Sequence, residues 1–287
     1  MVAFGLTIFP TDKAIDPMQL AIAAEERGFE SLWFPEHSHI PTSRETPWGL
    51  RADAPPLPEE YWRTHDQFLA LAMAGAVTTK LRLGTGITLV AQRDPIWLAK
   101  SVATIDALTG GRFLFGVGYG WNKEELAHHG VQFGERRAVL RERVLAMKEL
   151  WTQDEASFSG EHVQFSSSWA WPKPTQAPHP PIILGGAAGP KTMAHIVEFC
   201  DGFMPIAGRV DYAQQVRDLR RIAAESGRDP DSFELGQFGT RPTPEYIDPI
   251  IEAGAHRILF MLPPKGADTV LSMLDDLAAV ADRYNNA

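Results

Sequence analysis

A short segment of the chain brings together the side chains best suited to move protons. Glu36, His37 and His39 all lie within residues 36–39. Imidazole titrates close to neutral pH, and a neighbouring carboxylate can tune or orient it, so His37 and Glu36 are candidate proton donors, proton acceptors or orienting groups. A loop histidine held by hydrogen bonds is the alternative interpretation. The residue types alone do not separate the two.

Three glycine-rich runs are the other segments that could take part in chemistry. They are residues 84–88, Gly-Thr-Gly-Ile-Thr; residues 116–122, Gly-Val-Gly-Tyr-Gly-Trp-Asn; and residues 184–191, Leu-Gly-Gly-Ala-Ala-Gly-Pro-Lys. Glycine lets a flat ligand approach the main chain closely. The last run leads into a predicted helix, whose first N–H groups suit a phosphate. Ordinary turns are the alternative, although the alternating glycines of residues 116–122 favour a ligand contact.

The elements that must position these segments alternate along the whole chain. Short β-branched or aromatic runs alternate with longer helix-period segments, as in a parallel sheet with crossover helices. The predicted strands are Val2–Phe9, Ser31–Pro35, Leu81–Thr85, Phe113–Val117, Pro181–Leu184, Gly202–Pro205, Glu234–Phe238 and Arg257–Leu262. The predicted helices are Pro17–Arg27, His65–Thr78, Pro95–Leu108, Glu135–Trp151, Pro190–Phe199, Tyr212–Ser226, Pro244–Ala253 and Ala267–Arg283.

These eight strand–helix units predict an α/β fold, a single (β/α)8 TIM barrel over residues 1–287. An open doubly wound sheet is the alternative fold, but no G-x-G-x-x-G fingerprint follows the first strand. Residues 37–64 and 154–179 fall outside the repeat, and long loops of this kind are often lids or binding loops. The first must lie at the carboxyl ends of the strands, where barrel active sites are found, whereas the second would have to cross over.

The composition excludes several other classes of function. The formal net charge of −9 argues against a general nucleic-acid surface, which needs a basic excess. No run of about 18 uncharged apolar residues suggests a membrane span, and the first ten residues read as a strand rather than a secretion signal. Cys200 is the only cysteine, which rules out an internal disulfide and fits a reducing compartment. We therefore expect a cytoplasmic protein.

A metal centre is the main rival chemistry for the histidine segment. The spacing of His37 and His39 resembles the metal-binding pair of barrel amidohydrolases. A metal hydrolase would need further His, Asp or Lys ligands at later strand ends. The predicted strands five to eight end in Leu-Gly-Gly, Met-Pro-Ile, Gly-Thr and Leu-Pro-Pro, which supply none. The sequence therefore predicts no metal.

Aromatic residues are concentrated in the predicted loops. Core packing is a poor explanation for all of Trp48, Tyr61, Trp62, Trp121, Trp169 and Trp171. Large aromatic side chains commonly line apolar ligand pockets, so some of these six are expected to cap a substrate pocket.

A series of short motifs runs in order along nearly the whole chain. They are Gly28-Phe29-Glu30-Ser31-Leu32-Trp33 with Glu36-His37, Leu83-Gly84-Thr85-Gly86, Leu98-Ala99-Lys100, Thr104-Ile105-Asp106, Gly110-Gly111-Arg112, Gly116 to Trp121, Phe158-Ser159-Gly160-Glu161, Pro172-Lys173-Pro174 and Pro180-Pro181-Ile182 leading to Gly185-Gly186. This ordered series resembles the luciferase-like monooxygenase superfamily. It is more specific for the superfamily than for the cofactor.

The resemblance implies a (β/α)8 barrel with an insertion before strand five, commonly a homodimer, with a tricyclic flavin or deazaflavin across the carboxyl-end mouth. The short chain, Pro41-Thr42 and residues 118–121 look most like the actinobacterial branch that uses coenzyme F420. In that branch, the residues that match Gly86-Ile87 form a cis non-proline peptide that bulges against the deazaflavin ring. Such a bond costs about 3 kcal/mol and persists only where the surrounding structure enforces it.

The resemblance also implies roles for individual residues. His37 would contact the ring or the substrate. The candidate cofactor contacts are Gly86, Ile87 and Thr88 after strand three; Gly118, Tyr119, Gly120, Trp121 and Asn122 at the ring edge and side chain; and Gly185, Gly186 and Ala187 at the phosphate. F420-dependent sugar-phosphate dehydrogenases of the superfamily carry a glutamate directly after the strand-four glycines. Trp121-Asn122 stands near that place here, which argues against a sugar-phosphate substrate.

The leading hypothesis is an F420-dependent oxidoreductase that transfers a hydride between the deazaflavin and a small hydrophobic substrate, with His37 and Glu36 as the groups that handle a proton. The cofactor supplies the chemistry and the barrel supplies orientation. The nearest alternative is an FMN-dependent monooxygenase that receives reduced flavin from a partner flavin reductase and activates O2. A non-catalytic flavin-binding protein is a further alternative. A homodimer would use the helices that follow strands two and three, and neither nucleic acid nor membrane is an expected partner.

Overall fold

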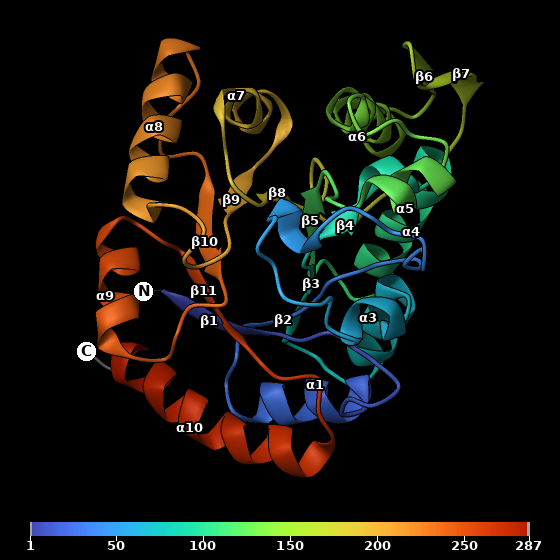
Figure 1. Cartoon of the computed structure of the whole chain (residues 1–287). Helices are drawn as coiled ribbons and strands as arrows, with labels where there is room; N and C mark the ends of the chain where they lie inside the picture. Colours follow the sequence, from blue (N-terminus) through green and yellow to red (C-terminus); the bar gives the residue numbers. More distant parts are fainter. Residues whose placement is uncertain (1, 286–287) are drawn as a thin grey trace.

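Eight parallel strands form a closed barrel in the computed structural model, which describes residues 2–285; residue 1 and residues 286–287, at the ends of the expected domain, lie outside the described residues (Figure 1). The barrel strands are β1 (Ala3–Thr7), β2 (Ser31–Phe34), β3 (Arg82–Thr85), β5 (Phe113–Gly118), β8 (Ile182–Gly185), β9 (Gly202–Met204), β10 (Glu234–Phe238) and β11 (Arg257–Met261). Neighbours run in the order β3-β2-β1-β11-β10-β9-β8-β5, and pairing of β3 with β5 closes the ring. The predicted barrel is confirmed.

Helices surround the barrel and follow its strands (Figure 1). They are α1 (Pro17–Glu26), α2 (Glu60–Arg63), α3 (Gln67–Ala76), α4 (Pro95–Leu108), α5 (Lys123–His128), α6 (Arg136–Thr152), α7 (Pro190–Phe199), α8 (Tyr212–Glu225), α9 (Pro244–Glu252) and α10 (Ala267–Asn285), with short 3-10 turns η1 (Trp48–Leu50) and η2 (Val90–Gln92). Asp16 and Asp94 accept the first helical N–H groups of α1 and α4, as their Asp-Pro sequences predict. No helix within residues 2–285 is both long and apolar enough to cross a membrane.

The barrel interior is filled by large side chains that lie against glycines. Trp33, Leu114, Ile183, Met204, Phe238 and Leu259 form one buried cluster inside the ring. A Cβ atom added at Gly84 would stand 2.2 Å from the Trp33 ring, and one added at Gly116 would stand 3.3 Å from it. Gly84 therefore leaves room for the indole, whereas a Cβ atom at Gly116 would chiefly collide with the carbonyl group of Thr85. Because side chains pack the interior, any ligand must bind above it, at a strand end.

The amino ends of the strands are closed by an ion-pair network. The guanidinium of Arg257 is 4% exposed and donates to both carboxylate oxygens of Glu30, at 2.7 and 2.8 Å, and it also pairs with Glu234. It lies 5.7 Å from the centre of the Trp33 ring. A buried charge needs such paired and hydrogen-bonded surroundings. This end of the barrel is therefore sealed, which leaves the carboxyl ends for function.

Both long excursions contain regular structure that the sequence analysis did not predict. Residues 37–64 include η1 and α2, and residues 154–179 begin with an antiparallel hairpin of β6 (Ala156–Ser159) and β7 (Gln164–Ser168). The hairpin packs on α6, where Glu142 accepts the amide of Glu161 at 3.0 Å. Two further short elements, β4 (Thr88–Leu89) and α5, follow β3 and β5. All of these elements are too short to show a hydrophobic period in the sequence.

Candidate active site

His37 is paired with a buried glutamate from another part of the chain. Its Nδ1 lies 2.8 Å from Oε2 of Glu125, and the two side chains are 6% and 0% exposed. His37 follows β2 and Glu125 lies in α5, the helix that follows β5. The other oxygen of Glu125 accepts the amide of Ser38 at 3.2 Å. A carboxylate at Nδ1 orients the imidazole and leaves Nε2 as the nitrogen free to exchange a proton with a ligand.

Glu125 is a residue of the candidate site that the sequence analysis did not single out. Asn122 begins α5, and its side chain faces the amide of Glu125 at 3.5 Å. The pattern Asn122-x-x-Glu125 is that of a capping box, which signals a helix start. That signal was present in the sequence, but a helix of six residues leaves no periodic pattern to support it. Nothing local indicates that its glutamate meets a histidine 88 residues earlier.

The β2–α3 loop is fastened to α5 by the neighbouring glutamate. Oε2 of Glu124 accepts the hydroxyl of Thr46 at 2.6 Å, and Oε1 accepts the amides of Glu45 and Thr46 at 2.9 and 3.1 Å. Burial would raise the pKa of Glu124, but these hydrogen bonds outweigh it and lower the pKa to about 2. The carboxylate therefore stays ionised at neutral pH and holds the loop over the pair formed by His37 and Glu125.

Glu36 occupies a different setting from the one expected of a proton carrier. Its carboxylate accepts the amide of Leu89 at 2.6 Å and Nε of Arg93 at 2.9 Å. Arg93 also pairs with Asp66 at the start of α3, at 2.9 Å. Burial lowers the pKa of the Arg93 guanidinium, but the two carboxylates raise it by more. Glu36 thus ties the end of β2 to the segment after β3, while Glu125 is the carboxylate in contact with His37.

Aromatic side chains enclose the histidine. The ring centres of Tyr61 and Trp121 lie 5.1 and 5.8 Å from that of His37, and Trp48 packs against Tyr61 at 5.7 Å. Burial raises the pKa of Tyr61, so the phenol is neutral. Three of the six loop aromatics therefore gather around His37. They form an apolar wall that keeps water from this side of the imidazole.

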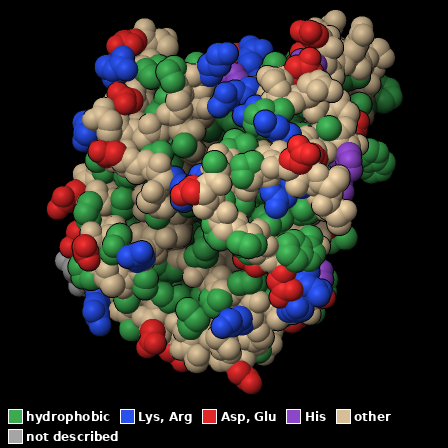
Figure 2. All heavy atoms as spheres, in the orientation of Figure 1, with side chains coloured by type: hydrophobic (Ala, Val, Ile, Leu, Met, Phe, Trp, Pro, Cys, Tyr) green, Lys and Arg blue, Asp and Glu red, His purple; other side chains and the backbone are tan. Residues whose placement is uncertain are grey.

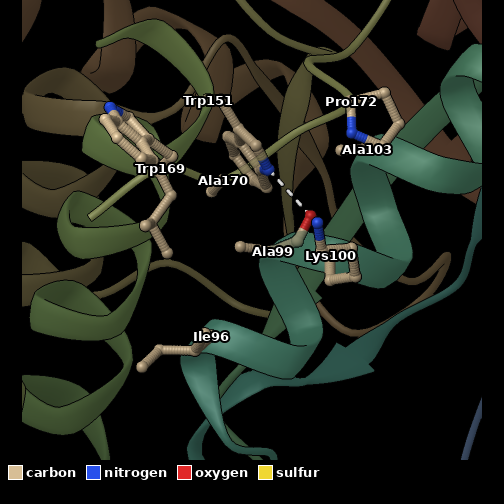
Figure 3. A pocket seen from close by; sticks show the side chains of 9 residues that line it. Ile96, Ala99, Lys100, Ala103, Trp151, Trp169, Ala170 and Pro172 are labelled. Carbon is tan, nitrogen blue, oxygen red and sulfur yellow. Dashed lines mark hydrogen bonds between the residues drawn. The ribbon is translucent and has the colours of Figure 1, made fainter. Parts of the chain in front are cut away.

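The other loop tryptophans lie elsewhere. Trp169 borders a groove on the helix layer, together with Trp151 and residues of α4 (Figure 3). Trp171 packs close by, under Lys173 at 5.1 Å. Trp62, at 52% exposed, faces solvent. The aromatic side chains around His37 thus come from the loop after β2 and the turn after β5, and the second excursion borders a separate apolar groove.

The segment after β3 carries an isoleucine across the strand ends. The Gly86–Ile87 peptide bond is cis, the geometry that the resemblance implies. A Cβ atom at Gly118 would stand 2.5 Å from Cδ1 of Ile87, and one at Gly185 would stand 2.5 Å from Cγ2. Ile87 is only partly buried and packs on the interior cluster. The side chain of Ile87 thus forms a platform on top of the packed barrel interior. It lies between Gly118 and Gly185, which have no side chains.

Two expected cofactor contacts have side chains engaged in other interactions. The hydroxyl of Tyr119 lies 2.8 Å from Nδ1 of His195 on α7, and Arg137 lies 5.2 Å from the Tyr119 ring. This side chain therefore points into the helix layer. Thr88 is buried and its hydroxyl accepts from Nε2 of Gln67 at 3.1 Å. The hydroxyl groups of both residues are therefore engaged within the protein.

The turn from β8 to α7 offers free main-chain donors. Gly186 has a positive φ of 105°, and a Cβ atom there would meet nothing within 4 Å. Within residues 2–285 the amides of Gly186 and Ala187 have no hydrogen-bond acceptor, whereas Ala188 is held at both N and O by Gln215, at 3.0 Å each. Lys and Arg side chains gather beside α7 on the surface of this acidic protein (Figure 2). Free amides at a helix start, near positive charge, suit a phosphate.

Across the described part of the chain, no group of three or more His, Cys, Asp or Glu residues is placed to hold a metal ion. The thiol of Cys200 is buried.

Comparison with known proteins relates most of the chain to one family. Residues 12–242 match the family model described as luciferase-like monooxygenase. An uncharacterized protein of Mycobacterium tuberculosis is 41% identical over 276 residues, covering 96% of this chain and 97% of that protein. The F420-dependent glucose-6-phosphate dehydrogenase of Amycolatopsis mediterranei is 30% identical over 68% of this chain and 54% of its own length. The FMNH(2)-dependent dimethylsulfone monooxygenase of Pseudomonas putida is 37% identical over 53% of this chain and 42% of its own length.

Solved structures agree with the fold. A monooxygenase from Streptomyces bottropensis has a TM-score of 0.77 at 19% identity, covering 99% of this chain and 100% of that one. The coenzyme F420-dependent tetrahydromethanopterin reductase of Methanopyrus kandleri has a TM-score of 0.73 at 18% identity, covering 96% and 97%. At these identities the likeness concerns the barrel alone.

Proposed function

Because the chain belongs to the luciferase-like monooxygenase family, whose members include F420-dependent and FMN-dependent enzymes, we propose that it is an F420-dependent oxidoreductase acting on a small hydrophobic substrate. The observation that carries this proposal is the buried pair of His37 and Glu125 at the carboxyl ends of the strands. Hydride transfer to a carbonyl, or from an alcohol, must be accompanied by movement of a proton. An imidazole oriented by a carboxylate is well suited to that task.

The residues present fit a deazaflavin at the mouth. The platform of Ile87, with the bare main chain of Gly118 and Gly185 on either side, would support a planar ring. The amides of Gly186 and Ala187 would bind the phosphate. The deazaflavin, when bound, supplies the hydride donor or acceptor. The F420-dependent relative, which matches two thirds of the chain, supports this choice of cofactor.

The protein itself would bind, orient and move one proton. Nε2 of His37 donates a proton to a carbonyl oxygen, or accepts one from a hydroxyl, while Glu125 holds Nδ1 and stabilises the charged imidazole. Tyr61 and Trp121 exclude water from this side of the ring. In a dry site the interaction between the imidazole and the carboxylate is stronger than in water.

The walls of the mouth favour an apolar substrate. Met261 at the end of β11 is 58% exposed, and Ile206, just after β9, is 44% exposed. Both lie at the carboxyl ends of barrel strands, the end that also carries Trp48 and Tyr61. Exposed large apolar side chains near a candidate site are typical of binding sites for hydrophobic ligands. A hydrophobic ketone, alcohol or unsaturated carbonyl compound fits these surroundings.

Titration of the apoprotein with F420 and, separately, with FMN tests the cofactor. Binding at the mouth should quench Trp121, so Trp121→Phe should remove much of the fluorescence change. Trp169→Phe, in the groove on the helix layer, is the matched control and should leave the change intact. Micromolar F420 binding with FMN at least about tenfold weaker supports the proposal. Preference for FMN, with turnover that depends on O2 and a flavin reductase, would replace it with the monooxygenase alternative.

We further propose that the protein forms a homodimer through α3 and α4. Leu69 and Met73 on α3 are 70% and 47% exposed, and Ile96 and Trp97 on α4 are 48% and 74% exposed. These helices are neighbours in the outer ring (Figure 1). Large apolar side chains that are exposed together on one surface often mark a site of protein–protein interaction. These are the helices that follow strands two and three.

A further inference from the structure

The buried pair of His37 and Glu125 needs a route by which protons reach solvent. Its side chains are 6% and 0% exposed, and Tyr61 and Trp121 cover the imidazole. Cofactor and substrate would fill the mouth on the remaining side. Each turnover of the proposed reaction leaves His37 with one proton more or fewer, so that proton must pass through the protein. The inference therefore rests on the proposed function.

Three further histidines and a serine form a hydrogen-bonded cluster beside this pair. Oγ of Ser38 lies 2.7 Å from Nε2 of His129 and 3.0 Å from Nδ1 of His39. Nε2 of His39 in turn lies 2.8 Å from Nδ1 of His128, with the two rings stacked. The side chains of His128 and His129 are exposed. Every contact in the cluster joins two atoms that can each carry a proton.

The cluster adjoins the buried pair at Glu125. The carboxylate that contacts His37 also accepts the amide of Ser38, at 3.2 Å. His129 lies four residues after Glu125 at the end of α5, so the two side chains occupy one row of the helix. Burial lowers the pKa of His129, while the charge of Glu125 acts in the opposite direction. The buried carboxylate and the exposed imidazole are therefore in electrostatic contact.

We propose that Ser38, His39, His128 and His129 form a proton relay between solvent and the buried pair. In alcohol oxidation, the hydroxyl proton of the substrate passes to Nε2 of His37, and the Nδ1 proton leaves toward Glu125. It then crosses to the cluster and reaches solvent. Among the described residues no hydrogen bond joins the His129 ring to the Glu125 carboxylate, so the proposed route requires a bridging water at this step. Carbonyl reduction uses the same route inward.

Burial and most of the nearby charges lower the pKa of His129, which favours its neutral imidazole. The groups that face His129 are Glu125, Arg93, His39 and His128, and all except Glu125 oppose its protonation. Arg93 is itself held by two carboxylates. A neutral imidazole can accept a proton at one nitrogen and release one from the other, which a relay requires.

Nuclear magnetic resonance titration of the histidine rings tests the coupling without any cofactor. Glu125→Gln should lower the pKa of His129, because it removes the negative charge of Glu125 that favours the protonated imidazole. Ser38→Ala should weaken the mutual influence of the His39 and His129 titrations. The half-buried His162, in the β6–β7 turn, should titrate unchanged in both variants. An unchanged His129 pKa in Glu125→Gln would overturn the relay, whichever cofactor the protein uses.

Turnover with F420 and a hydrophobic secondary alcohol tests the route itself. In His129→Gln, we expect multiple-turnover rates at least about fivefold lower, a larger solvent deuterium effect, an unchanged single-turnover hydride transfer, and rescue by added imidazole. His162→Gln is the control. Rates and isotope effects equal to those of the wild type would overturn the relay. Absence of any F420 turnover by the wild type would instead refute the proposed function, and the ring titration would still decide whether the cluster is coupled to Glu125.

Discussion

The side chain of Ile87 lies so close to Gly118 that a Cβ atom added to the glycine would stand 2.5 Å from Cδ1 and 2.8 Å from Cγ1 of the isoleucine. On its other side, Gly185 is equally close to Cγ2, at 2.5 Å. Gly118 ends β5 and Gly185 ends β8, and these strands are paired. Each glycine thus makes room for one branch of a single isoleucine side chain.

Alanine at either glycine should therefore destabilise the mouth, and shortening Ile87 should reverse the effect. We expect Gly118→Ala and Gly185→Ala each to lower the free energy of unfolding by about 1–3 kcal/mol, because overpacking forces the side chain to move. Ile87→Ala should rescue both variants, since only Cβ then remains, at 3.6 and 3.8 Å. Urea denaturation of the single and double variants measures the coupling.

Ile87→Val is the discriminating control for this arrangement. It removes Cδ1 and keeps Cγ2, so it should relieve Gly118→Ala in part and Gly185→Ala not at all. Equal rescue of the two glycine variants by valine would show that the isoleucine does not bridge them as described.

Replacing the three acid–base candidates should separate proton transfer from architecture. We expect His37→Ala to lower kcat by about 10²–10⁴-fold, as loss of a general acid–base group does, and Glu125→Gln to lower it by about 10²-fold with a changed pH profile. Glu36→Gln should chiefly reduce stability, by roughly 1–3 kcal/mol, because it leaves Arg93 without its buried partner.

Steady-state kinetics and urea denaturation of the same three variants check this division. A Glu36→Gln variant that loses kcat as severely as His37→Ala while keeping its stability would restore Glu36 to the role of proton carrier. A Glu125→Gln variant with the kcat and pH profile of the wild type would remove Glu125 from the site.

The barrel was predictable from the sequence because its elements carry strong local signals. Strand Glu234–Phe238 and helices Pro95–Leu108 and Pro190–Phe199 have the predicted bounds, and flanking proline, aspartate and glycine residues mark such ends clearly. The mouth was harder to predict. Ile87 and Gly118 could be singled out by glycine content, but their contact depends on how β3 and β5 close the ring.

The chemical partner of His37 could not be predicted in the same way. Glu36 is the carboxylate nearest to His37 in the sequence. A sequence pattern alone favours such neighbours as interaction partners. The fold instead turns Glu36 toward Arg93 and brings Glu125 to the imidazole from 88 residues away. The different positions of Trp121, beside His37, and Trp169, at the groove on the helix layer, could not be predicted for the same reason. Only packing shows which loop aromatic faces the mouth.

The hydrogen bonds by which Glu124 of α5 holds the β2–α3 loop should weaken at low pH. The pKa of Glu124 is lowered from 4.5 to about 2 by the hydroxyl of Thr46 and nearby amides, despite the opposing effect of burial. A carboxyl group whose pKa is lowered on folding stabilises the protein above its unfolded pKa, and this contribution is lost as the pH falls through the folded value. We therefore expect the contribution of Glu124 to be complete above about pH 5 and to fade toward pH 2.

Urea denaturation of the wild type and Glu124→Gln at several acidic pH values measures this contribution. The difference in free energy of unfolding between the two proteins should shrink as the pH falls. Glu161→Gln, which changes an exposed glutamate in the β6–β7 turn, is the control and should run parallel to the wild type. A difference between wild type and Glu124→Gln that does not vary with pH would contradict the assignment.

A substitution on the proposed dimer face of α3 and α4 should change the oligomeric state of the protein. Trp97 is 74% exposed on α4, and burying a side chain of this size against a second copy would contribute about 2 kcal/mol or more. Trp97→Glu should therefore convert a dimer into monomers in sedimentation velocity experiments, because it places a charge in a desolvated interface. Tyr246→Ser, on α9 across the barrel from this face (Figure 1), should leave the dimer intact. A wild type that sediments as a monomer at all concentrations would refute the homodimer, and a Trp97→Glu variant that remains dimeric would place the interface on other helices.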